Sequence, residues 1–347
     1  MDSVTQAALG ASVGFLCWRD KLGRKAVIGG AVIGTIPDLD IIVYPLLDSV
    51  QRLYWHRGES HSVFFILLGA LLTGWVLQQL IHRHRISYYS AFAGCFLIYA
   101  THVLIDVYTV YGTQLFAPFS RYGYALGNMF IIDPLLTLPL LLSISAALVS
   151  PSRASGIINS GALFIVICYS IWSLLIQSYA DKQFQQALVK MNVVASRNLT
   201  SASPLNTLLW RHVAETPDGY LFGYWSILDQ PEREIVFYHI PRNEQATASF
   251  RQSRAFAVVD WFSKGWWIAL ETGENRVKIV DIRFTEIPAS ANDPYQRWNW
   301  PFSWVFEKDS QPSQLQRAEQ LPQDFSGTLE LLTNRINGGT GWLNHTP

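Results

Sequence analysis

Three short groups of histidine and aspartate stand at the ends of apolar segments. They are Pro37-Asp38-Leu39-Asp40, His56-Arg57-Gly58-Glu59-Ser60-His61-Ser62, and Thr101-His102-Val103-Leu104-Ile105-Asp106. Ionisable side chains in such places are costly unless they are paired or bound to metal. Imidazole together with carboxylate suits Zn²⁺, Mn²⁺ or Fe²⁺ better than Ca²⁺ or Mg²⁺. The sequence therefore predicts a site for one or two divalent transition metal ions, with zinc expected, and its ligands are Asp38, Asp40, His56, His61, His102 and Asp106.

The predicted chemistry is hydrolysis. A metal cluster of this kind lowers the pKa of bound water to near neutrality and polarises a phosphoryl or acyl oxygen. Asp133, which opens a later apolar segment, is a further candidate for catalysis. Arg57 and Arg121 could clamp an anionic group of the substrate, such as phosphate.

Other functions fit some of these residues. A His-x-x-x-Asp pair on one helix face often only joins two helices by a hydrogen bond, and the Asp38/Asp40 pair could cap the following segment. The alternative function is therefore a catalytically silent membrane scaffold or binding protein with a structural His/Asp cluster. A transporter is disfavoured, because it would need ionisable residues at the bilayer middle and on both sides.

The elements that must position these residues are membrane helices. Half of the 347 residues are hydrophobic and only 15% are charged, whereas soluble proteins carry about 25% charged residues. Six apolar stretches could cross a bilayer, at roughly 4–18, 26–47, 62–81, 88–110, 129–149 and 157–179. We predict an α-helical polytopic membrane domain of about six helices over residues 1–179, the first of them short.

Basic residues predict the orientation of these helices. Alternate loops carry Arg19, Lys21, Arg24 and Lys25, then Arg83 and Arg85 with His82 and His84, then Arg153. Short loops rich in Lys and Arg stay in the cytoplasm. The chain is then N-out with six crossings. The three His/Asp groups and everything after Tyr179 lie outside the cytoplasm, as does the loop that carries Arg121.

Residues 180–347 are predicted to form a mainly-β soluble domain with a helical linker, 180–200, at its start. The expected strands are 208–214, 220–228, 234–240, 255–261, 265–271, 276–285 and 302–307, separated by turn sequences. Its many tryptophans are expected to form a core. Because the net charge is zero, nucleic acid is not an expected partner.

The ordered motifs resemble the YdjM/YbcI-type family of bacterial and archaeal inner-membrane proteins. That family shows Met-Asp-x-x-Thr-His, Pro-Asp-x-Asp, His-Arg-Gly-x-Thr-His-Ser and His-x-x-x-Asp in this order. Here Met1-Asp2-Ser3-Val4-Thr5-Gln6 precedes the three groups already described, and Tyr111 to Ser120 and Ile132-Asp133-Pro134 also match. The resemblance covers roughly residues 1–150 and implies a membrane-bound, metal-dependent hydrolase of the inner membrane. It also suggests a distant similarity to zinc-dependent phospholipase C and P1-type nucleases, which act on phosphodiesters.

Three positions depart from the family pattern, and the mildest is Ser60 in place of threonine. Gln6 replaces a histidine, which implies that one metal is lost, weakened or completed by water. Glu59 stands at a usually apolar position and adds a carboxylate that could act as a base or replace a metal ligand. Access from the outer leaflet would suit a membrane lipid or a lipid-linked substrate as partner, and the sequence identifies no protein partner.

Overall fold

The computed structural model describes residues 1–81, 86–288, 298–308, 314–318 and 325–339. The chain divides into two compact units. One comprises Met1–Leu46 and Trp55–Leu174, and the other Leu47–Tyr54 and Leu175–Pro347. The predicted basic loop of His82, Arg83, His84 and Arg85 lies outside the described residues.

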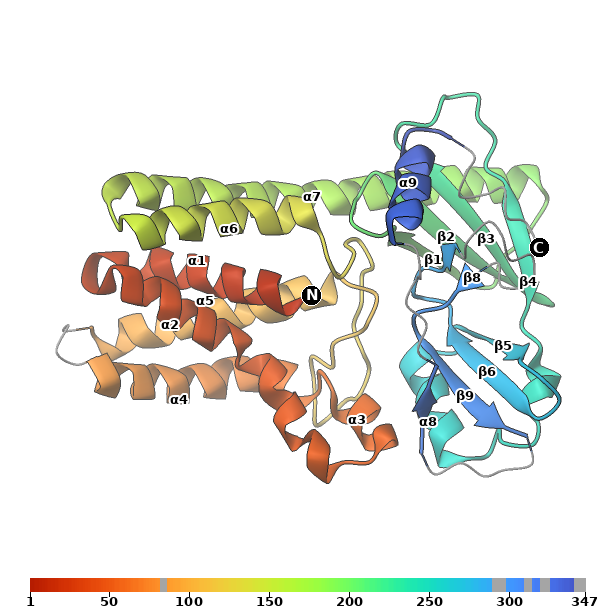
Figure 1. Ribbon diagram of the computed structural model, residues 1–347, viewed down its shortest axis with the longest axis horizontal. Coiled ribbons are helices and arrows are strands. Elements are labelled where there is room, and N and C mark those ends of the chain that lie inside the picture. The colour runs from red at the N-terminus through yellow and green to blue at the C-terminus, as the bar shows by residue number, and fades with distance from the viewer. Residues whose placement is uncertain (82–85, 289–297, 309–313, 319–324, 340–347) are drawn as a thin grey trace. The chain divides into compact units, whose positions relative to one another are not determined.

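The first unit is helical (Figure 1). Its elements are α1 (Ser3–Leu22), α2 (Arg24–Thr35), the 3₁₀ segment η1 (Pro37–Leu46), η2 (Glu59–His61), α4 (Val63–Ile81), α5 (Tyr88–Val107), α6 (Pro134–Val149) and the first part of α7 (Arg153–Lys190). The short α3 (Ser49–Trp55) belongs mostly to the second unit. Side chains cap three of the helices: Asp2 caps α1, Ser87 caps α5 and Asp133 caps α6.

Three or four segments of this unit are suited to crossing a membrane, where the sequence predicted six. Among the described residues, α4, α5 and α7 are long and apolar enough, and α2 with η1 forms a fourth span if the two, bent by 47°, count as one. The 16 residues of α6 rise by about 24 Å, less than the bilayer core of about 30 Å. Helix α1 has the length but ends in charged residues and is largely buried by its neighbours.

Helices α1 and α2 approach each other closely through glycine. Each carries a Gly-x-x-x-Gly pair, Gly10 with Gly14 and Gly30 with Gly34. A Cβ added at Gly14 would lie 2.7 Å from the Gly30 Cα, and one at Gly34 would lie 2.9 Å from the Gly10 Cα. Only hydrogen fits at these positions, so the two backbones pack directly, as small-xxx-small pairs allow in membrane helices.

The second unit contains two four-stranded antiparallel sheets. One has the order β1-β2-β3-β4 and the other β10-β9-β6-β5. The strands are β1 (Asn198–Ala202), β2 (Leu209–Thr216), β3 (Gly219–Ser226), β4 (Phe237–Pro241), β5 (Trp267–Glu271), β6 (Arg276–Asp281), β9 (Ser303–Glu307) and β10 (Gln316–Arg317), with β7 (Ile287–Pro288) and β8 (Trp298–Asn299) paired separately. The mainly-β expectation is confirmed at this level, and Trp210, Trp267, Trp300 and Trp304 are buried, as predicted.

Two local predictions in this unit were wrong, and one helix was not predicted. Residues 255–261 form part of helix α8 (Arg254–Ser263) and not a strand. The Ser253 hydroxyl accepts a hydrogen bond from the Phe256 amide, so this serine caps a helix whose buried residues recur at helical spacing. The linker helix ends at Lys190 and β1 follows within the range predicted as helix, while a last helix, α9 (Phe325–Ile336), was not predicted.

A buried ion pair joins strand β2 to the segment between β6 and β7. The Arg211 guanidinium on β2 lies 2.6 Å from the Glu286 carboxylate, which follows β6, and neither side chain is exposed. Tyr224 and Tyr238 both donate their hydroxyl hydrogens to Glu286. Burial, together with the Glu286 charge, holds the pKa of Tyr238 well above its usual range, so this tyrosine stays a donor.

The glycine contact predicts opposite effects at two adjacent positions. An added Cβ at Gly30 would overlap the Gly10 carbonyl oxygen, whereas one at Gly29 meets nothing within 4 Å. We expect Gly30→Ala to lower the free energy of unfolding by about 1–3 kcal/mol through overpacking. Gly29→Ala should leave it unchanged or raise it by up to about 1 kcal/mol, because alanine favours helix. Unfolding of the two variants in detergent checks this, and equal effects would contradict the direct backbone contact.

The buried ion pair predicts a second stability difference. Glu286→Ala leaves the Arg211 charge buried without its carboxylate, and we expect a loss of about 3–5 kcal/mol in unfolding free energy. The matched control is Glu271→Ala, which breaks a surface pair in which the Lys308 Nζ lies 2.9 Å from Glu271 Oε1 and should cost about 0–1 kcal/mol. Chemical unfolding of the full chain, followed by tryptophan fluorescence, would separate the two.

Candidate metal centre

Helix α5 supplies two of the candidate ligands from one face. His102 and Asp106 are one turn apart, and both side chains are buried. The His102 Nε2 atom lies 3.5 Å from Asp106 Oδ2. The same face carries Ile98, Tyr99 and Val103 into the core, so the 3.6-residue period that packs the helix also directs the two polar groups inward.

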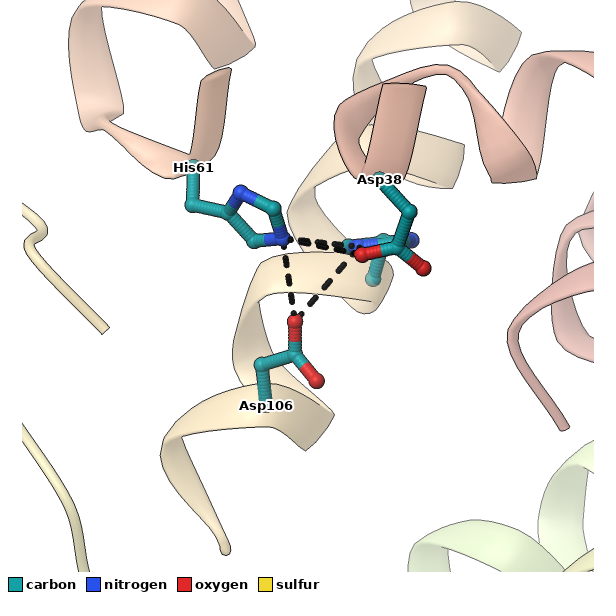
Figure 2. Close-up of side chains that lie close together, drawn as sticks. Asp38, His61 and Asp106 are labelled. Atoms are coloured by element: carbon teal, nitrogen blue, oxygen red, sulfur yellow. Dashed lines mark hydrogen bonds and ion pairs between the residues drawn. The ribbon is translucent and has the colours of Figure 1, made fainter. Parts of the chain in front are cut away.

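Two 3₁₀ segments bring the other ligands to this face. His61 ends η2, and its Nε2 atom lies 3.2 Å from Asp106 Oδ2 and 3.3 Å from His102 Nε2. Asp38 lies at the start of η1, with Oδ1 at 3.3 Å from His61 Nε2 and 3.6 Å from His102 Nε2. Figure 2 shows Asp38, His61 and Asp106 directed toward one point. Asp38 is the open member of the group, since its side chain is 24% exposed and the other three are at most 1% exposed.

The proton on His102 is placed by a backbone group. Its Nδ1 atom lies 2.7 Å from the Gly34 carbonyl oxygen. A carbonyl only accepts, so Nδ1 carries the hydrogen, and in the neutral ring Nε2 turns its lone pair toward the cluster. The His61 ring is fixed in a related way by the Ser60 hydroxyl, 2.9 Å from its Nδ1 atom. Metal-binding histidines use such second contacts to hold their orientation.

The donor atoms lie close enough together to hold a metal ion. Asp38, His61, His102 and Asp106 each offer one atom, and all four atoms lie within 4.8 Å of one another. The separations given above run from 3.2 to 3.6 Å. Ligands placed tetrahedrally at about 2.0–2.2 Å from Zn²⁺ would be roughly 3.3–3.6 Å apart. Two nitrogens and two oxygens this close together could hold one divalent ion.

The two carboxylate oxygens of Asp106 have different surroundings. Its Oδ1 atom lies 3.0 Å from Arg57 Nη2 and contacts the amino group of Met1. Its Oδ2 atom is buried and has no hydrogen-bond partner among the described residues. A buried carboxylate oxygen without a donor is costly, and this oxygen is the one that faces His61 and His102. A metal ion in the cluster would satisfy it.

Asp40 and His56 form a separate pair. The His56 Nδ1 atom lies 3.0 Å from Asp40 Oδ2, which also accepts the backbone N–H of Arg57 at 3.0 Å. Neither residue belongs to the four-residue group, although Asp40 Oδ1 is buried and has no hydrogen-bond partner in the part of the chain described. The structure thus brings together four of the six predicted ligands, and a second ion at Asp40 and His56 stays a prediction.

The two candidate anion-binding arginines already have partners. Arg57 is buried, holds Asp106 and donates to the Thr109 hydroxyl at 3.2 Å, so it positions a candidate ligand. Arg121 forms a bidentate ion pair with Glu59 and donates to Gln114 Oε1 at 3.2 Å. Glu59 is therefore held by an arginine rather than directed at the four ligands. A catalytic role for it stays a prediction.

Asp133 lies in a structural network. It caps α6 by accepting the Leu135 amide at 3.0 Å, and it accepts the Tyr169 hydroxyl at 2.7 Å. Gln6, at the position of the family histidine, is buried and donates to the His102 carbonyl oxygen at 3.3 Å. Gln6 thus supports the backbone that carries a candidate ligand, while catalysis by Asp133 stays a prediction.

Sequence reasoning missed the supporting groups. The Gly34 carbonyl fixes the His102 tautomer, yet a backbone carbonyl leaves no mark in residue types. Thr109 and Tyr169, which bind Arg57 and Asp133, look like ordinary residues of apolar segments. The spacing of Gly30 and Gly34 with Gly10 and Gly14 was the available signal, since it predicts which backbones come close.

Comparison with known proteins places the chain in a family. The model of the family described as "YdjM inner membrane protein" matches residues 1–182. An uncharacterised protein of Bacillus subtilis (strain 168), YfhP, is 24% identical over 302 residues, which cover 82% of this chain and 87% of the relative. No solved structure matches the chain. Because the family match spans more than half of the chain and contains all four residues of the cluster, this protein belongs to the YdjM family of inner membrane proteins.

Proposed function

We propose that this protein is a membrane-bound, metal-dependent hydrolase that acts on a phosphoester of a membrane lipid or a lipid-linked substrate. The observation that carries the proposal is the set of four donor atoms of Asp38, His61, His102 and Asp106, which lie within 4.8 Å of one another. Zinc is the proposed metal, because two imidazoles and two carboxylates suit it. A bound zinc ion would supply a water of lowered pKa and would polarise the phosphoryl oxygen.

The protein's own residues keep the donors in the state that metal binding needs. The Gly34 carbonyl holds the proton of His102 on Nδ1. The Arg57 guanidinium lies 3.0 Å from Asp106 Oδ1 and pairs with its charge. Asp38 is the candidate ligand closest to solvent or substrate, since it alone of the four is partly exposed. Substrate would therefore approach from the side of η1.

The surroundings of Asp38 support a lipid substrate. The segment η1 that carries it exposes Leu39, Ile41, Ile42, Val43 and Leu46. Exposed apolar side chains in such a run are typical of contact with a bilayer or a partner. In the proposed orientation, with the domain after residue 180 outside the cytoplasm, this segment meets the outer leaflet of the inner membrane.

Arg121 is the proposed binder of the substrate's phosphate. It now holds the Glu59 carboxylate through both terminal nitrogens. Phosphate offers oxygens at a similar spacing and also binds arginine in a bidentate way. A phosphoester could therefore exchange with Glu59, which would free this carboxylate to accept a proton as the predicted base.

The second candidate is a structural role. His61, His102 and Asp106 are buried, and the cluster joins α5 to η1 and η2, so it could staple the helices without catalysis. Metal content and turnover separate the two candidates.

The proposal predicts a stoichiometric metal. Protein purified in detergent and loaded with zinc should hold about one ion per chain. His102→Ala should weaken binding by more than the roughly 10–100-fold that changes around a metal ligand cost. His56→Ala is the matched control, because His56 lies outside the four-residue group, and it should keep the ion. Elemental analysis of monodisperse fractions measures this, and a wild-type protein without metal after reconstitution would contradict the proposal.

Turnover is the second test. With zinc bound, the protein should release phosphate or an alcohol from phospholipids in mixed micelles. Asp38→Asn should reduce the rate by at least about 10²-fold, because it removes the charge of the partly exposed ligand. Arg121→Ala should mainly raise KM. A folded, metal-loaded protein that releases nothing from a panel of phospholipids and lipid diphosphates would favour the structural role.

A further inference from the structure

A groove of about 490 Å³ runs along the helical unit between α1, α2 and α6. Small residues of α1, among them Ala7, Ala8 and Ala11, form part of its lining, and larger side chains such as Ile28 and Val32 of α2 and Leu141 of α6 line it as well. The small residues matter, because alanine on α1 leaves room that a larger side chain would fill.

The groove suits a hydrocarbon chain. Of the twelve residues that line it, only Ser3 has a polar side chain. A polar ligand would lose its hydrogen bonds to water and regain almost none, whereas an apolar chain pays no such cost. From Ser3 to Ala11 the groove follows α1 for about 12 Å, close to the roughly 15 Å depth of one leaflet. Its dimensions and chemistry therefore match part of one acyl chain.

Both helices lead from the groove to the metal cluster. On α1 the lining begins at Ser3, two residues after Met1, whose amino group contacts Asp106. On α2 it extends to Val32, and Gly34, two residues on, accepts the His102 hydrogen bond. Asp38, the partly exposed ligand, follows at the start of η1. The end of the groove with its one hydroxyl is thus the end nearest the cluster.

We propose that this groove holds one hydrocarbon chain of the substrate, so that the substrate is a long-chain lipid whose phosphoester lies at Asp38. This inference rests on the proposed function and makes it specific, since a soluble phosphoester would leave the groove empty. The chain would act as an anchor, and its burial would place the headgroup at the cluster.

Binding can be tested without turnover. Metal-free protein in nanodiscs that contain a phosphatidylglycerol with a diazirine in its acyl chain is irradiated, and the labelled peptides are identified by mass spectrometry. We expect labelling of α1, α2 and α6 to exceed that of the lipid-facing helix α4. Ala7→Phe, and independently Ala31→Leu from the α2 side, should lower the groove labelling by about tenfold, the equivalent of losing some 55 Å² of apolar contact.

The control is Ala93→Phe, which places the same side chain on an exposed position of α5 that does not line the groove. This control should change neither the labelling of the groove helices α1, α2 and α6 nor that of α4. Each variant is used only if it elutes as a monodisperse species. Two independent groove variants are made so that the test still stands if one of them misfolds. Groove labelling equal to that of α4 and insensitive to both groove variants would overturn the inference. So would a dimer that these variants dissociate, because a second copy would then occupy the groove.

Turnover separates this inference from the proposed function. If the lipid is hydrolysed, both groove variants should lower the ratio of kcat/KM for long-chain to short-chain phospholipid by at least about tenfold, and Ala93→Phe should preserve it. Hydrolysis with an unchanged ratio would overturn the groove and leave the hydrolase intact. Specific groove labelling in a protein that hydrolyses nothing would keep the lipid site and overturn the enzyme.

Discussion

The negative charge of Asp106 is the constraint on which the helical unit depends. Its carboxylate is fully buried in α5, where an uncompensated charge would cost several kcal/mol. One oxygen forms ion pairs with Arg57 and the Met1 amino group. The loop before α4 and the start of α1 must therefore both reach α5. The other oxygen faces the cluster, with His61 Nε2 at 3.2 Å. A metal ion in the cluster would compensate this side of the carboxylate.

Helix packing and site chemistry are linked through Gly34. Because α1 and α2 touch backbone to backbone at their glycine pairs, the end of α2 is fixed close to α1 and α5. The Gly34 carbonyl at that end then meets His102 Nδ1 at 2.7 Å. A side chain at Gly34 would collide with the Gly10 Cα, and the shift needed to relieve the collision would move the carbonyl that sets the tautomer. Small residues chosen for packing in lipid therefore also determine which nitrogen of His102 can bind a metal.

The candidate ligands could be predicted from sequence because metal chemistry restricts residue types, and a helix fixes His102 and Asp106 on one face. Which four of the six candidate ligands come together could not be predicted from sequence. The segments η1 and η2 turn by local 3₁₀ geometry, and Arg57 adopts a left-handed backbone with φ of 54°. These turns direct His61 into the cluster and leave His56 to Asp40. In the second unit, the apolar run after Ser253 suits strand and helix equally, and only the serine cap and the buried spacing decide for helix.

The position of Asp38 decides how such a site would meet its substrate. A metal cluster open to water would select by charge and shape, and any phosphoester in solution could compete. Here the exposed ligand is flanked by apolar side chains of η1 that are themselves exposed, and the apolar groove begins two residues from Met1, which contacts Asp106. Under the proposed function, a substrate would reach Asp38 by partition into an apolar environment, in which electrostatic interactions are stronger and water is scarce. Selection by partition favours the molecule that already resides there, which is a lipid.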